Sequence, residues 1–335
     1  MNKKTTYFLA ITGLLLLLIA AVLFSLSVGE MHIGLGDALR LLAGGGNSDS
    51  LEYMLVTQVR LPRIMLGMAV GGALSLAGAM LQGVYRNPLV EPFTLGISGG
   101  ASLGVAAVIV LGWQASLGGL LLPLAGFAGA LAVLALVWFF GTRKRQVNIQ
   151  HILLVGVMVS FICSSGMMFL MSIASSESLH GIVFWTMGSL DEPNTALVWI
   201  TVGATIAVLA LSLLFVNPLN ALRLGEERAL HLGVNTQLAV KLLFVLASVL
   251  TGLCVAVAGV IGFVGLIVPH LVRLMFGNDY RILLAGSFLL GASFLLLSDV
   301  AARSIIAPNE LPIGVITGLV GGVVFIFLMS RKIAR

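Results

Sequence analysis

Runs of about twenty apolar residues recur along the whole 335-residue chain, and no other feature restricts its fold as strongly. A helix of that length spans the hydrocarbon core of a bilayer, where only a helix or a closed barrel satisfies its backbone hydrogen bonds. The composition agrees, because 59% of the residues are hydrophobic, only 9% are charged and the mean hydropathy is +1.12. We therefore predict an all-α, polytopic membrane protein with a single transmembrane domain over residues 1–335.

The apolar runs predict about ten membrane-spanning helices. Segment 239–276 is too long for one span, and its glycine-rich stretch 258–265 suits a tight turn, so it counts as two. The first run exceeds the apolar core of a signal peptide and is expected to remain as an uncleaved span. The predicted spans are 7–28, 61–84, 93–111, 117–140, 152–173, 196–216, two helices within 239–276, 282–302 and 312–330.

The span 61–84 is predicted to lie at the centre of the bundle. It is rich in small residues, and Gly67 and Gly71 are four residues apart, a spacing that lets two helix backbones approach closely in lipid. Such a helix offers little side-chain surface to lipid. We therefore expect the other spans to pack around it.

The distribution of Lys and Arg supports the count of ten spans. With the N-terminus inside, fourteen of the 18 fall on the inner side and four on the outer side, namely Arg40, Arg60, Arg63 and Arg303. This bias follows the positive-inside rule, and it accounts for the pI near 9.6 without a nucleic-acid partner. One span fewer would place the basic C-terminal tail outside, so we expect both termini inside.

Three outer arginines lie at the ends of predicted spans, although positive charge is disfavoured on that side. Arg60 and Arg63 share one face if their segment is helical, because they are three residues apart, and Arg303 ends a later span. One interpretation is ordinary snorkelling of long side chains to the interface. The other is a basic patch that docks an acidic partner or an anionic solute from outside.

The sequence contains no motif for catalysis, metal binding or nucleotide hydrolysis. It has no HExxH and no Walker phosphate loop, and His151 and His270 are single residues interpreted as structural. Glu91, Asp299 and Glu310 lie at or near span ends, whereas ion-coupled transporters usually keep ionisable groups at the midplane. We therefore predict no enzyme activity, cofactor or metal site, and secondary transport is the weaker alternative.

Residues 217–237 form the longest polar interlude in the second half of the chain. At helical spacing one side is apolar and the other charged, and Gly225 is expected to divide the segment into two short helices. The alternatives are a plain surface loop and an amphipathic helix pair presented to a soluble partner. The apolar side comprises Ala221, Leu224, Ala229 and Leu232, and the charged side comprises Arg223, Glu226, Glu227 and Arg228.

Six stretches together resemble one protein family. They are RLPR (60–63), GGALSLAGAMLQ (71–82), RNPLVEPFTLGISGGA (86–101), LRLGEERALHLGV (222–234), GFVGLIVPHLVR (262–273) and ELPIGVITGLVGG (310–322). In this order and spacing they are similar to the permease subunits of type II ABC importers for iron–siderophore, haem and cobalamin, the FecCD/BtuC-like family. The resemblance runs from about residue 50 to the C-terminus, and it implies ten helices, in agreement with the count from charge.

The resemblance also implies roles for individual residues. In the family, two loops close a gate on the cytoplasmic side of the path. The second of them departs from the family pattern here, because it reads Asn148-Ile149-Gln150 where some relatives have small hydroxyl residues. The implied binding-protein docking residues are Arg60, Arg63 and Arg303, and the cytoplasmic gate is Asn87, Pro88 and Leu89. The implied coupling helices present Leu224, Gly225, Glu226, Ala229, Leu232 and Gly233 to an ATPase. Spans five and ten would line the translocation path with Met158, Ser165, Met168, Gly314 and Thr317.

The implied assembly is an importer in the bacterial inner membrane, with both termini in the cytoplasm. Two permease subunits would surround the path, expected as a homodimer with a paralogue pair left open. Two cytoplasmic ATPase subunits would drive transport, and a periplasmic binding protein would deliver the solute. The implied solute is an iron chelate, a siderophore or haem, with cobalamin as the alternative. A gradient-driven transporter and a membrane-embedded enzyme are the competing function classes.

Overall fold

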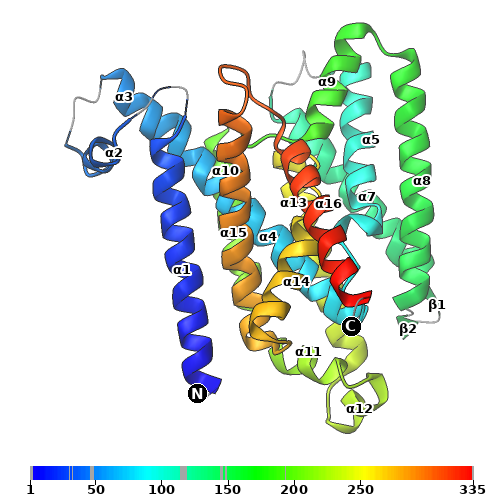
Figure 1. Cartoon of the computed structure of the whole chain (residues 1–335). Coiled ribbons are helices and arrows are strands. Elements are labelled where there is room, and N and C mark those ends of the chain that lie inside the picture. The colour runs from blue at the N-terminus through cyan, green and yellow to red at the C-terminus, as the bar shows by residue number, and fades with distance from the viewer. Residues whose placement is uncertain are drawn as a thin grey trace.

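The computed structural model describes residues 3–29, 31, 33–45, 49–113, 119–143, 146–147, 149–192 and 194–333. This part of the chain forms a bundle of apolar helices with shorter elements at each end (Figure 1). Seven helical segments are long and apolar enough to cross a membrane, and three shorter apolar helices join them, which confirms the predicted all-α polytopic class. The helices are α1 (Lys3–Ser27), α4 (Leu61–Val84), α5 (Ile97–Val110), α7 (Leu121–Gly141), α8 (Ile149–Ile173), α10 (Thr195–Leu213), α13 (Thr236–Ala258), α14 (Val264–Phe276), α15 (Tyr280–Ser304) and α16 (Ile313–Ile333).

Shorter elements connect these helices at the two ends of the bundle. They are α2 (Leu35–Leu42), α3 (Leu51–Met54), the π-helical η1 (Leu55–Arg60), the 3-10 helix η2 (Pro92–Leu95), α9 (Ser176–Met187), α11 (Val216–Leu222) and α12 (Glu226–His231). Strands β1 (Thr142–Arg143) and β2 (Gln146–Val147) form a small antiparallel hairpin in which Thr142 pairs with Val147. Figure 1 places α2, α3 and the α15–α16 loop at one end, here the α3 end. The hairpin, α11, α12 and both termini lie toward the other, here the α12 end.

Helix α4 lies at the centre of the bundle, as its small residues predicted. Its most apolar stretch is 89% buried, and it runs obliquely through the middle of the view in Figure 1. A Cβ on Gly71 would lie 2.4 Å from the carbonyl oxygen of Gly291, and one on Gly78 would lie 1.9 Å from that of Gly265. Neighbouring backbones therefore approach α4 at distances that only glycine permits.

The long apolar run 239–276 is two helices, as predicted, with the break after Ala258. Gly259 has φ +69°, and a Cβ there would lie 2.4 Å from the carbonyl oxygen of Trp185. Phe263, which precedes the first turn of α14, also has a positive φ of +67°. This turn reverses the chain within the bundle and sets the position of α14 beside α4 and α15.

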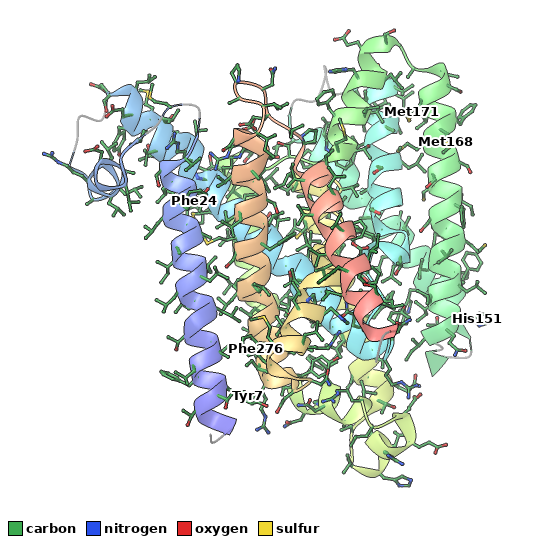
Figure 2. All side chains as sticks on the ribbon, in the orientation of Figure 1. Tyr7, Phe24, His151, Met168, Met171 and Phe276 are labelled. Carbon is green, nitrogen blue, oxygen red and sulfur yellow. The ribbon has the colours of Figure 1, made fainter. Side chains whose placement is uncertain are left out.

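Several helices keep large apolar side chains on the outside of the bundle. Phe24 on α1 and Met168 on α8, both labelled in Figure 2, are 50% and 69% exposed. Helix α16 exposes Leu319 and Val323 in the same way. Such faces suit contact with lipid or with another membrane-embedded chain.

Candidate docking, gate and coupling sites

The three arginines predicted to dock a binding protein meet at the α3 end around one carboxylate. Asp299 on α15 has a side chain that is only 1% exposed, and it pairs with two of them. Arg63 Nε and Nη2 lie 3.1 and 2.9 Å from Asp299 Oδ1, and Arg303 Nε lies 3.0 Å from Oδ2. One buried carboxylate thus pairs with two guanidinium groups. We name Arg60, Arg63, Asp299, Arg303 and Glu310 the Asp299 cluster.

Two of these arginines also hold the end of α1. Arg60 donates from Nη1 to the carbonyl oxygen of Leu26 and from Nη2 to that of Met31. Arg303 donates from Nη1 to the carbonyl oxygen of Val28, at 3.1 Å. The last carbonyls of a helix have no partner within the helix and carry the negative end of its dipole, so guanidinium groups stabilise them. Both arginines are consequently buried, at 4% and 8% exposure.

Arg63 is the arginine of the Asp299 cluster that extends toward the surface. Its Nη1 and Nη2 lie 3.1 and 2.8 Å from the two carboxylate oxygens of Glu310, a residue whose side chain is 41% exposed. A cavity of 90 Å³ lies among the three arginines and Glu310. The structure therefore brings the predicted docking residues together but engages each of them internally, and their docking role stays a prediction.

The predicted gate residues form a tight turn after α4. Asn87 Oδ1 accepts a hydrogen bond from the backbone N–H of Leu89 at 3.0 Å, which closes an Asx turn across Pro88. Leu89 is 44% exposed. The residue before the turn, Arg86, has φ +51°, a left-handed conformation that non-glycine residues rarely adopt. The gating role of this turn stays a prediction.

Two polar side chains, the buried Gln82 and the half-buried Glu91, attach this turn to α14. Gln82 Nε2 donates to the carbonyl oxygen of Val90 at 3.2 Å and to that of Gly265 at 3.1 Å. Gly265 needs this partner because Pro269, four residues later, has no N–H to offer. Glu91 Oε1 accepts from the backbone N–H of Phe263 at 2.7 Å and so caps the start of α14. Sequence reasoning missed this clamp, because its partners are more than 170 residues apart.

The predicted coupling segment contains two short helices, α11 and α12, and Gly225 separates them as expected. Gly225 has φ +109° and Gly233, just after α12, has φ +81°, so both turns use backbone conformations that favour glycine. Ala229 is fully buried in α12. Glu226 begins α12, where a carboxylate complements the helix dipole, and its Oε1 lies 3.4 Å from Thr236 Oγ1.

The four apolar residues of this segment do not share one side, which corrects the expectation from spacing. Ala221 and Ala229 are buried, whereas Leu224 and Leu232 are 55% and 63% exposed. The turn at Gly225 changes the direction of the chain, so a helical face drawn through α11 does not continue into α12. Leu230, which spacing did not select, is also 55% exposed. Leu224, Leu230 and Leu232 are here called the leucine tip.

The residues predicted for the translocation path lie on two different kinds of surface. Met158, Ser165 and Met168 are exposed on α8. Thr317 on α16 is fully buried, and a Cβ on Gly314 would lie 2.4 Å from the carbonyl oxygen of Met187. The two α16 residues therefore pack against neighbouring elements of the same chain, and the exposed face of α16 is elsewhere. The path assignment stays a prediction.

The remaining predictions concern metals, cysteines and the second gate. Within the part of the chain that the structure describes, no three His, Cys, Asp or Glu residues are grouped to hold a metal ion. Cys163 and Cys254 are free and buried. Asn148 of the second gate loop lies outside the described residues, and Ile149 and Gln150 begin α8.

Several known proteins similar to this chain are transport proteins, and their matches cover nearly the whole chain. A sequence model of the FecCD transport family matches residues 16–331. The chain is 37% identical to the hemin transport system permease protein HmuU of Yersinia pestis, over 99% of this chain and 98% of that one. It is 40% identical to the vitamin B12 import system permease protein BtuC of Salmonella typhi, over 96% and 94%. A solved, inward-facing structure of a metal-chelate type ABC transporter superposes with a TM-score of 0.83 at 32% identity, over 97% and 99%.

Proposed function

The chain belongs to the FecCD transport family as a permease subunit of an ABC transporter, and we propose that it imports an iron chelate, either haem or a siderophore. The family implies a location in the inner membrane, separate ATPase and binding-protein partners, and a second permease subunit. The chain itself is not an enzyme. We propose that the second subunit is a copy of this chain and that the α12 end faces the cytoplasm, because most Lys and Arg residues lie toward it.

The relatives support a bulky metal chelate as the solute. By name, one permease serves hemin, one serves vitamin B12, and the solved structure is of a metal-chelate type transporter. The exposed side chains of Met158, Ser165 and Met168 on α8 offer polarizable and small groups rather than charges. A path of this kind binds a chelate weakly enough to release it. Cobalamin is the second candidate, favoured by the 40% identity to the vitamin B12 permease.

The leucine tip is the observation that carries the proposed coupling to an ATPase. Three large apolar side chains are exposed on and beside the short helix α12, at 55%, 55% and 63%. Apolar side chains concentrated on a polar connecting segment mark a protein contact. We propose that Leu224, Gly225, Glu226, Ala229, Leu232 and Gly233 form the segment that an ATPase moves, with Ala229 as its buried anchor.

The gate and the docking site complete the proposal. We propose that Asn87, Pro88 and Leu89 close the path at the α12 end, and that Gln82 and Glu91 transmit movement of α14 to this turn. At the α3 end we propose that a binding protein docks on Arg63, the most accessible arginine of the Asp299 cluster, while Arg60 and Arg303 hold the site in shape. Gly314 and Thr317 then support the path by packing rather than by touching the solute.

A pull-down tests the proposal. The full chain, with a tag at its C-terminus, is purified from membranes in mild detergent, and co-purifying proteins are identified by mass. We expect an ATPase subunit at one copy per permease. Serine at both Leu224 and Leu232 should release it, whereas serine at Leu111, which is 55% exposed at the end of α5, should not.

The solute is then read from the binding protein of the same system. Haem, a ferric siderophore and cobalamin are compared for binding to that protein and for stimulation of ATP hydrolysis by the reconstituted complex. Stimulation by haem or a siderophore supports the proposal, and stimulation by cobalamin alone supports the alternative. If no ATPase co-purified and uptake persisted without ATP, the coupling proposal would be wrong.

A further inference from the structure

A cavity of 420 Å³ lies at the α12 end, next to the proposed gate turn, and it includes Pro88 and Gln82 in its lining. None of the roles above uses its arginines. Its walls come from the end of α4, the end of α11, the last turns of α14 and the start of α15. Its polar lining includes Arg86, Arg223, His270, Arg273, Asn278 and Tyr280. We name this cavity the arginine pocket.

The arginine pocket contains positive charge without a counter-charge. Three of its lining residues are arginines and none is Asp or Glu. Every salt bridge between residues that the structure describes lies in the Asp299 cluster, so these three arginines have no carboxylate partner there. Like charges gathered in one cavity repel each other, and the potential they create favours an anion.

The nearest acidic residue in the sequence is turned to other partners. Asp279 caps α15, and its carboxylate accepts from Asn220 Nδ2 at 2.9 Å, from Tyr7 Oη at 3.1 Å and from the backbone N–H of Arg281 at 3.0 Å. Its oxygens are therefore occupied. This acid stabilises the junction of α1, α11 and α15 rather than the pocket.

Two of the arginines have hydrogen-bonding capacity left over. Arg273 interacts electrostatically with the Tyr280 side chain, but its Nη1 is buried without an acceptor among the described residues. Arg223 Nη1 donates to the carbonyl oxygen of Asn278 at 2.6 Å, which leaves the rest of its fork unused. The missing acceptor costs free energy at the buried Nη1 of Arg273, and a bound anion removes that cost. Arg223 is exposed, so its remaining donors face solvent and are free to meet an anion.

Arg86 is held in the pocket at a cost in backbone conformation. Its φ of +51° is one of two positive values at non-glycine residues in the described chain. Its side chain makes no hydrogen bond or ion pair with a described residue, so the conformation is not compensated by a contact of the guanidinium. Strained residues of this kind are concentrated at functional sites.

The rim of the pocket points to the chemistry of the ligand. Guanidinium forks match the geometry of phosphate oxygens and bind them through two hydrogen bonds. Beside the pocket, the last turn of α14 exposes Leu274 and Met275 at 55% and 60%, and Figure 2 shows Phe276 of the same turn at the lower end of the bundle. A basic pocket between membrane helices, next to an apolar helix end, is suited to a phospholipid headgroup.

We propose that the arginine pocket binds a phosphate group, supplied by a phospholipid headgroup or by soluble phosphate. The bound phosphate joins Arg86 at the gate turn, Arg223 at the end of α11 and Arg273 on α14, three elements with no carboxylate between them. The site depends neither on the identity of the transported solute nor on the ATPase contact.

The test measures thermal unfolding of the full chain, delipidated in a maltoside detergent. The probes are inorganic phosphate against chloride at equal ionic strength, and dioleoyl phosphatidylglycerol against dioleoylglycerol, which has the same tails without phosphate. We expect at least one phosphate probe to raise the midpoint by a few degrees. Glutamine at Arg86 and Arg223 together should weaken that probe roughly tenfold or more, because charge-assisted hydrogen bonds are lost.

Arg228→Gln is the matched control, because it removes the same charge from an exposed residue of α12 outside the pocket. It should respond to phosphate as the unaltered chain does. A single cooperative unfolding transition in each variant without probe shows that it folds. A response to phosphatidylglycerol alone identifies the lipid as the source, and a response to inorganic phosphate identifies the soluble anion.

Two outcomes would overturn the proposal. One is a phosphate response that the Arg86 and Arg223 substitutions leave unchanged. The other is no response to any phosphate probe. A pocket-dependent shift that then appears only when an ATPase subunit is bound would identify a different occupant. In that case a protein carboxylate, not a phosphate, occupies the pocket.

Discussion

Three arginines meet at each end of the bundle, and the two groups differ in how their charge is compensated. At the α3 end, Asp299 and Glu310 pair with arginine forks, and the end of α1 supplies carbonyl acceptors. At the α12 end, the arginine pocket has no acidic lining residue. The same residue type therefore serves two purposes in one chain. A compensated group fixes helices to one another, whereas an uncompensated group is ready for an anion from outside.

The largest expected effect is the loss of Asp299, because the compensated group depends on it. Alanine at this position leaves Arg63 and Arg303 buried without their shared carboxylate. Breaking a buried ion pair in this way destabilises a protein by about 3–5 kcal/mol. The measurement is the free energy of unfolding in mixed micelles of a maltoside and dodecyl sulfate. A loss below about 1 kcal/mol would show that the cluster behaves like a surface ion pair.

Substitution of Arg86 in the arginine pocket should have the opposite effect to loss of Asp299, because we expect it to increase the free energy of unfolding. Glycine adopts the left-handed conformation of this residue without strain, so Arg86→Gly should stabilise the unliganded chain by about 1 kcal/mol. Arg86→Ala removes the same charge but keeps the Cβ, and it should bring little gain. If both variants had equal stability, the left-handed backbone conformation of Arg86 would not destabilise the chain.

A smaller effect is expected when the arginine pocket is given a carboxylate of its own. Asn278→Asp places an acid on the pocket wall near Arg223 and so imitates the compensation seen around Asp299. Because Asn278 is exposed, the gain should be only about 0.2–1 kcal/mol. The stabilisation by the phosphate probe should fall sharply in the same variant, as measured by thermal unfolding. A full phosphate response would mean that the anion lies elsewhere.

The membrane-spanning helices could be predicted from the sequence, because their signals are local. Length and hydropathy indicated each span, the distribution of Lys and Arg set their number, and the small residues of α4 indicated a central position. The glycines at 225 and 259 marked breaks that the structure contains. The error in the coupling segment has a local cause as well, since a helical face cannot be extended through a turn such as that at Gly225.

Which arginines are paired with a carboxylate could not be predicted, because the pairing depends on contacts between residues far apart in the sequence. Arg63 and Asp299 are 236 residues apart, so the sequence showed three outer arginines but not the acid between them. The arginine pocket gathers Arg86, Arg223 and Arg273 from three separate elements, and the sequence presented each only as one of many inner basic residues. No spacing rule connects them. What the sequence indicates well is the amount of charge at each end, not its partners.

The smallest stability effect is expected at Glu310, the exposed edge of the compensated group. Its pair with Arg63 lies at the surface, so Glu310→Gln should change the free energy of unfolding by about 0–1 kcal/mol. Its effect on docking should be larger. If a binding protein offers a carboxylate to Arg63, as we propose, that carboxylate must displace Glu310. Removing the Glu310 charge should therefore strengthen binding several-fold at low salt.

The control is Glu52→Gln, which removes an equal charge from an exposed residue of α3 at the same end. Binding of the system's own binding protein to the immobilised permease is measured at low and at moderate salt. A gain for Glu310→Gln but not for Glu52→Gln assigns the effect to the Arg63 fork. Equal gains would instead reflect the net charge of the α3 end, which salt screens. In that case the Asp299 cluster would serve only to hold α1, α4 and α15 together, and the two arginine groups would divide cleanly into structure and binding.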